Sequence, residues 1–162
     1  MRQTLIVNSR YNHDTNVVGI GIVIHETDDS AGGRKGEVID RVSESYSGIT
    51  PNLSEILALY RALEIAIQRD YKVVELMSDC NPLRKSLKKS YEERLQFDRP
   101  DLYGKILNMT THFDTVKFGL KPGRKNQTAR GLSLVGTKEM EPLVNEYFVE
   151  ICCTSSPRLT KL

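Results

Sequence analysis

The sequence predicts an α/β protein built on one mixed five-stranded sheet, in which three antiparallel strands precede two parallel ones and helices flank the sheet. Two observations predict this class. Three segments with β-branched or alternating apolar residues come first, and segments of helical spacing then alternate with two short apolar runs. The chain has 162 residues, 39% of them hydrophobic, which is enough to bury one ordinary core.

The first half of the chain predicts the three antiparallel strands. Residues 5–7 and 17–24 are rich in Val and Ile, and the turn formers of residues 11–16 between them indicate a long hairpin. A polar loop at residues 28–33 leads to residues 37–46, where apolar and charged residues mix as in a partly exposed third strand.

The second half predicts alternating helices and strands. From Pro51 the apolar residues recur at helical spacing as far as Ile67, with Asn52 and Ser54 as available caps. Strands follow at residues 72–77 and 115–120, and helices at 82–89, 100–112 and 126–134. We therefore expect one domain over residues 1–136 and a C-terminal extension over residues 137–162.

Composition narrows the class of protein. The net charge of +2 permits a nucleic-acid partner without requiring one. No apolar run approaches a membrane span, and the N-terminus does not resemble a secretory signal, so we expect a cytoplasmic protein without a membrane partner. Cys80, Cys152 and Cys153 lack metal-ligand spacing and are odd in number, which favours reduced thiols.

Four motifs occur in order on the predicted elements. They are Val7-Asn8-Ser9 with the glycine-containing run 19–24, then Asn52-Leu53-Ser54-Glu55, then Leu76-Met77-Ser78-Asp79-Cys80, and last the segment 123–132, which ends in Ala129-Arg130-Gly131-Leu132. In this order they resemble the type 1 ribonuclease H family of the ribonuclease H-like superfamily, over roughly residues 4 to 135. The resemblance implies that family's fold, which has the same order of strands and helices.

The resemblance also implies a four-acid site that holds two divalent metal ions. Carboxylates supply the hard oxygen ligands that magnesium prefers. Glu55 and Asp79 match two of the four acids and are the candidate metal ligands, for Mg²⁺ or Mn²⁺, if the protein is active. Asn8 and Arg130 stand at the other two positions, where an amide is neutral and a guanidinium has no acceptor atom. The sequence therefore predicts a degenerate active site.

Other candidate residues would contact nucleic acid. Arg84, Lys85, Lys88 and Lys89 fall along one predicted helix, and Arg124 and Lys125 precede the last one. Such basic runs are also common on solvated helix faces. The resemblance adds Asn12, Asn52 and Asn126, although asparagine at a helix start also serves as a cap.

Three functions follow from these observations. The first is a ribonuclease H-like module that binds RNA/DNA hybrid or duplex nucleic acid and is catalytically inactive or severely impaired. The first alternative is an active magnesium- or manganese-dependent endoribonuclease that cuts the RNA strand of hybrids. The second alternative is a non-catalytic scaffold that binds a protein partner, because fold alone does not fix function.

Overall fold

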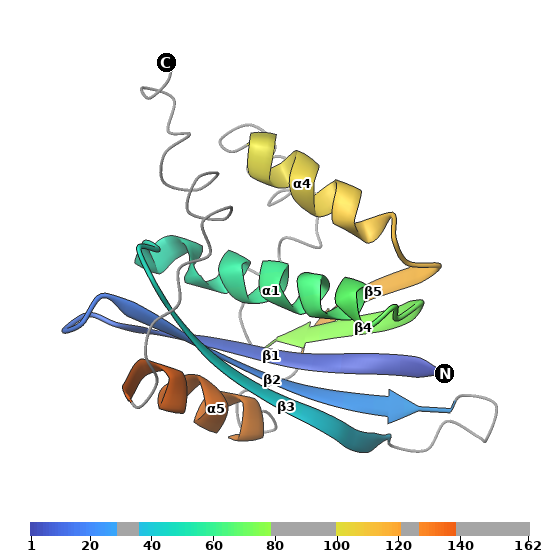
Figure 1. The fold of residues 1–162 in the computed structure, drawn as a ribbon, viewed down its shortest axis with the longest axis horizontal. Helices are drawn as coiled ribbons and strands as arrows, with labels where there is room; N and C mark the ends of the chain where they lie inside the picture. Colours follow the sequence, from blue (N-terminus) through green and yellow to red (C-terminus); the bar gives the residue numbers. More distant parts are fainter. Residues whose placement is uncertain (29–35, 79–99, 121–126, 139–162) are drawn as a thin grey trace.

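The fold is a mixed five-stranded sheet with helices on both faces (Figure 1). The computed structural model describes residues 1–28, 36–78, 100–120 and 127–138. The strand order is β3-β2-β1-β4-β5, in which β1 pairs antiparallel with β2 and parallel with β4. The strands are β1 (Arg2–Asn12), β2 (Val17–Thr27), β3 (Glu37–Ser47), β4 (Val73–Ser78) and β5 (Thr115–Leu120). The predicted fold class is confirmed.

Strand β1 extends further than its apolar stretch suggests. It continues to Asn12 and pairs with β2 along its whole length, so the hairpin turn is shorter than the predicted loop. The Asn12 Oδ1 accepts hydrogen bonds from the backbone N–H groups of Asp14 (2.9 Å) and Thr15 (3.4 Å). Asn16 closes the turn in the left-handed region, with φ 56°, which asparagine tolerates better than most residues.

Helix α1 (Ser54–Gln68) follows a short 3₁₀ turn at Pro51–Leu53 and covers one face of the sheet. Its residue at the N-cap is Leu53, whose side chain makes no capping hydrogen bond. The Ser54 hydroxyl instead donates to the Pro51 carbonyl oxygen at 2.8 Å, so the expected cap at Ser54 was wrong. Helix α4 (Pro100–Thr110) packs against α1 on the side away from the sheet.

Helix α5 (Gln127–Lys138) packs on the opposite face, over β1, β2 and β3. Two glycines of β2 allow its close approach. A Cβ at Gly21 would lie 2.0 Å from the carbonyl oxygen of Ala129, and one at Gly19 would lie 1.9 Å from that of Ser133. Any side chain at these positions would push the helix away, so the two glycines set where α5 sits.

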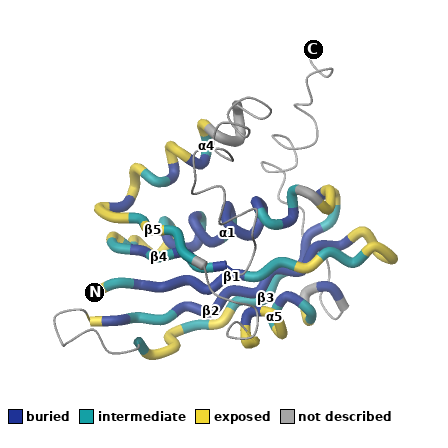
Figure 2. The backbone as a smooth tube through the Cα atoms, turned by 180° about the vertical axis from the view of Figure 1, so that it is seen from behind, coloured by how far each residue is buried: buried dark blue, intermediate teal, exposed yellow. Residues whose placement is uncertain are grey.

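Alternation along the strands divides the interior into two layers. Leu5 and Val7 of β1 face α1 and belong to the main core, whereas Ile6 packs with Val23 and Ala129 beneath α5. Figure 2 shows long buried stretches on β1, β2 and α1. Because side chains alternate, Asn8 lies on the α5 face, with Ile6.

Some expectations fall outside the described ranges. The helix predicted at residues 82–89 and the extension beyond residue 138 are among them, and the expected boundary at residue 136 falls within the last turn of α5. Within the described part of the chain, no helix is both long enough and apolar enough to cross a membrane.

Candidate nucleic-acid interface

Asn8 is held by a buried serine of α5. The Ser133 hydroxyl lies 2.8 Å from Asn8 Oδ1 and 2.8 Å from the carbonyl oxygen of Arg130. Ser133 has no exposed surface, whereas Asn8 is half-buried. A hydroxyl has one proton, so it donates to these two oxygens alternately or shares the proton between them. Ser133 therefore links the middle of β1 to the first turn of α5.

On the neighbouring strand β4, Ser78 is the last described residue before Asp79. Val7 pairs with Ser78 in the parallel ladder of β1 and β4, and β1 continues past that point to Asn12. Asp79 itself lies outside the described residues, so its predicted place beside Asn8 stays a prediction.

Arg130 lies in the first turn of α5 and is exposed. That turn contains no acidic residue, and no ion pair joins Arg130 to any described residue. Glu55 is therefore not paired with Arg130, and Asp79 lies outside the described residues. Within the described structure, no carboxylate forms an ion pair with this guanidinium.

Glu55 is half-buried in the first turn of α1, on the other side of the sheet from α5. A negative charge is favourable there, near the positive end of the helix dipole. No hydrogen bond or ion pair joins Glu55 to Asn8 or to Arg130. The structure thus links two of the four predicted site residues, Asn8 and Arg130, and the clustering of all four stays a prediction.

Asn8 and Arg130 offer no carboxylate to a pair of divalent metal ions. The described residues contain no group of three or more His, Cys, Asp or Glu side chains that could hold a metal. Asn8 Oδ1 is a neutral oxygen within hydrogen-bonding distance of Ser133, and Arg130 is a permanent cation in the helix turn beside it. Two hard dications need several carboxylate oxygens to balance their charge.

Most of the predicted basic contacts lie outside the described ranges. They are Arg84, Lys85, Lys88, Lys89, Arg124, Lys125 and Asn126. Asn52 lies in the 3₁₀ turn before α1, and its side chain is not described. Asn12 is described, and its Oδ1 stabilises the hairpin turn. Its predicted contact with nucleic acid is untested.

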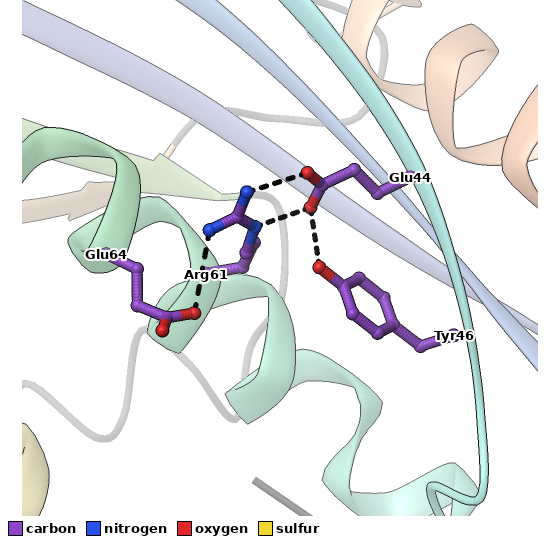
Figure 3. Close-up of polar contacts among 4 residues, drawn as sticks. All are labelled: Glu44, Tyr46, Arg61 and Glu64. Carbon is purple, nitrogen blue, oxygen red and sulfur yellow. Dashed lines mark hydrogen bonds and ion pairs between the residues drawn. The ribbon is translucent and has the colours of Figure 1, made fainter. Parts of the chain in front are cut away.

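A second polar cluster, which sequence reasoning missed, joins β3 to α1 (Figure 3). Arg61 donates from Nε and Nη2 to the two carboxylate oxygens of Glu44, at 2.7 and 2.9 Å, and Tyr46 donates to the same carboxylate at 2.8 Å. Glu64 lies 3.7 Å from Arg61 Nη1. Burial and the negative charge of Glu44 raise the pKa of Tyr46 above its ordinary value of 10.0. The hydrogen bond to Glu44 raises the pKa of Arg61.

Sequence comparison decides the family. Residues 7–134 match the model of the family described as reverse transcriptase-like. The chain belongs to this family. No curated protein matches the chain significantly. The match begins one residue before Asn8 and ends one residue after Ser133, so it spans both residues of the linked site.

Solved structures of ribonucleases H1 share the fold. The ribonuclease H1 of the halophilic archaeon Halobacterium salinarum NRC-1 superposes with a TM-score of 0.69 at 21% identity, over 86% of this chain and all of that one. LC11-RNase H1, isolated from compost and crystallised with an RNA/DNA hybrid, has a TM-score of 0.57 at 22% identity, over 80% of this chain and 92% of that one. A foamy viral protease-reverse transcriptase in complex with dsDNA has a TM-score of 0.59 at 15% identity, over 86% of this chain and 94% of that one. The predicted resemblance to the ribonuclease H-like superfamily is confirmed.

Proposed function

We propose that this chain is a ribonuclease H-like protein that binds nucleic acid and cleaves it weakly or not at all. The observation that carries the proposal is the contact between Asn8 Oδ1 and the buried Ser133 hydroxyl, next to the exposed Arg130. A neutral amide and a guanidinium stand where the resemblance places two carboxylates. Phosphodiester cleavage by a two-metal mechanism requires those negative charges, and their loss removes it.

The proposed partner is an RNA/DNA hybrid or a duplex. Two of the structurally similar proteins are described in complex with nucleic acid, one with an RNA/DNA hybrid and one with dsDNA. The basic residues predicted at 84–89 and 124–125 would supply phosphate contacts, which bind without regard to sequence. We place the protein in the cytoplasm, since three cysteines without a pairing pattern suit a reducing compartment.

One experiment separates the three candidate functions. A fluorescently labelled RNA/DNA hybrid is titrated with the protein at several salt concentrations in Mg²⁺, and the RNA strand is then examined for cuts. We expect binding that weakens steeply with salt and leaves the RNA intact. Rapid cutting would favour the active ribonuclease and overturn the proposal, and absence of binding at low salt would favour the protein-binding scaffold.

A further inference from the structure

Helix α5 packs on the sheet through a stripe that carries little apolar surface. The buried residues described on it, Ala129, Ser133 and Thr137, recur at every fourth position, and the last two are polar. Helix α1, on the other face, completely buries large apolar side chains such as Leu57 and Leu63. Because burial stabilises in proportion to the apolar area removed from water, α5 gains much less from packing than α1 does.

Hydrogen bonds replace part of this apolar contact, and one buried hydroxyl is left over. Ser133 Oγ lies 2.8 Å from Asn8 Oδ1, and the Ser43 hydroxyl donates to the Leu132 carbonyl oxygen at 2.6 Å. Ser45 lies two positions further along β3, so its side chain points to the same face as that of Ser43. Its hydroxyl is buried without a hydrogen-bond partner among the described residues. Water that enters when α5 leaves the sheet can hydrogen-bond to this hydroxyl, which lowers the free energy of the open state.

The sequence of α5 also disfavours a helix that stands alone. Gly131 lies inside it with no atom within 4 Å of an added Cβ, and Thr128 and Val135 are β-branched. The first turn has no acidic residue and contains the cation Arg130, near the positive end of the helix dipole. Without its contacts to the sheet, α5 therefore has little tendency to stay helical.

We propose that α5 opens and closes as a unit while the sheet, α1 and α4 stay folded. Opening breaks the contact between Ser133 and Asn8, and it carries the backbone of Arg130 away from β1. The candidate interface is therefore complete only in the closed state. Proteins open in such cooperative units at free energies below that of global unfolding. This inference goes beyond the proposed nucleic-acid binding and does not depend on it.

Amide hydrogen exchange of the natural chain, with each rate corrected for the intrinsic rate of its residue, measures the opening of each helix. We expect the amides of residues 131–137 to exchange at least about tenfold faster than those of Leu57 and Leu63, because they exchange from an open state in which α1 is still folded. Equal protection in α5 and α1 would overturn the inference.

Two glycine-to-alanine variants distinguish separate opening from global unfolding. Gly131 in α5 and Gly104 in α4 both have no atom within 4 Å of an added Cβ, so alanine should favour each folded helix by about two- to five-fold. Gly131→Ala should slow exchange in α5 by that factor. Gly104→Ala should slow exchange in α1, because it stabilises the chain against global unfolding, and leave exchange in α5 unchanged. If Gly104→Ala slows exchange in α5 as much as in α1, then α5 opens only with the whole fold and the inference is wrong.

Discussion

At the scale of single residues, the site depends on one buried hydroxyl that the motifs did not reveal. Asn8 and Arg130 could be singled out because the resemblance places acids at their positions in the order of motifs. Ser133 could not, since a serine in a helix has many ordinary roles and only the packing of α5 on β1 shows its contact. The sequence therefore predicts which residues occupy the site but not how they are held.

Removal of the Ser133 hydroxyl should destabilise the fold. In Ser133→Ala the half-buried Asn8 oxygen loses its contact with Ser133, and we expect a loss of about 1 kcal/mol in the free energy of unfolding. Thr128→Ala is the control, because Thr128 is exposed in the same helix and its replacement should change stability by less than about 0.5 kcal/mol. Urea unfolding measures both, and equal effects would contradict the role of the hydrogen bond.

Asp40 should make a contribution to the free energy of unfolding that depends on pH, and its lowered pKa determines the direction of that dependence. Its hydrogen bond with the Arg69 side chain, followed by one from the Arg41 backbone, lowers its pKa below the ordinary 3.8. A lowered pKa contributes stability above the unfolded value, and this contribution is lost as the pH falls through the lower folded value. Because both side chains are 37% exposed, the contribution should stay below about 1 kcal/mol.

The Asp40→Asn variant tests this. The natural chain should be slightly more stable than the variant near neutral pH, and the difference should disappear as the pH falls below 3.8. The measurement is the urea midpoint of both proteins, taken from neutral pH to below 3.8. A difference that stays constant with pH would show that the carboxylate charge does not contribute.

At the scale of elements, close packing between α5 and β2 controls the geometry of the site. The glycine-containing run 19–24 was recognised as part of a motif, and helix α5 was expected nearly where it lies. The sequence could not predict that α5 and β2 approach so closely that no Cβ fits between them. This packing depends on contacts between residues more than a hundred positions apart. Strand β1 was likewise predicted too short, since its pairing with β2 extends beyond the apolar residues.

Two glycine substitutions should therefore act in opposite directions. Gly21→Ala places a Cβ against the Ala129 carbonyl oxygen at 2.0 Å, so we expect a loss of at least about 3 kcal/mol or the release of α5. Gly131→Ala has no atom within 4 Å of the new Cβ and lies inside α5, so it should gain about 0.5–1 kcal/mol. Thermal unfolding, followed by circular dichroism, gives the unfolding temperature of each variant. Similar changes of that temperature in both variants would contradict the close approach of α5 to β2.

The link between β3 and α1 should also be measurable. Arg61 and Glu44 are 20% and 14% exposed, so Arg61→Ala leaves a largely buried carboxylate for which Tyr46 is the remaining hydrogen-bond donor among the described residues. We expect a loss of about 2 kcal/mol in the free energy of unfolding. Lys72→Ala breaks a pair whose side chains are 56% and 83% exposed, and it should leave the urea midpoint unchanged. Comparable losses in the two variants would show that burial does not strengthen the Arg61 pair.

At the scale of the whole molecule, the sheet order and the helix on each face follow from the sequence, and the activity does not. The alternation of strands and helices predicted the mixed sheet, and the family match and the structural neighbours confirm it. The same fold supports both cleavage and binding without cleavage. The proposed function assigns the choice between them to Asn8 and Arg130, because neither side chain carries a negative charge.

The cleavage of an RNA/DNA hybrid by the natural chain and by an Asn8→Asp, Arg130→Asp double variant tests the central claim most directly. Both proteins are incubated with labelled hybrid in Mg²⁺ and in Mn²⁺, and the rate of RNA cutting is measured. The account predicts that the natural chain cuts slower than the double variant by orders of magnitude, because the variant regains two carboxylates. Robust cutting by the natural chain in Mg²⁺, at a rate equal to or above that of the double variant, would contradict it.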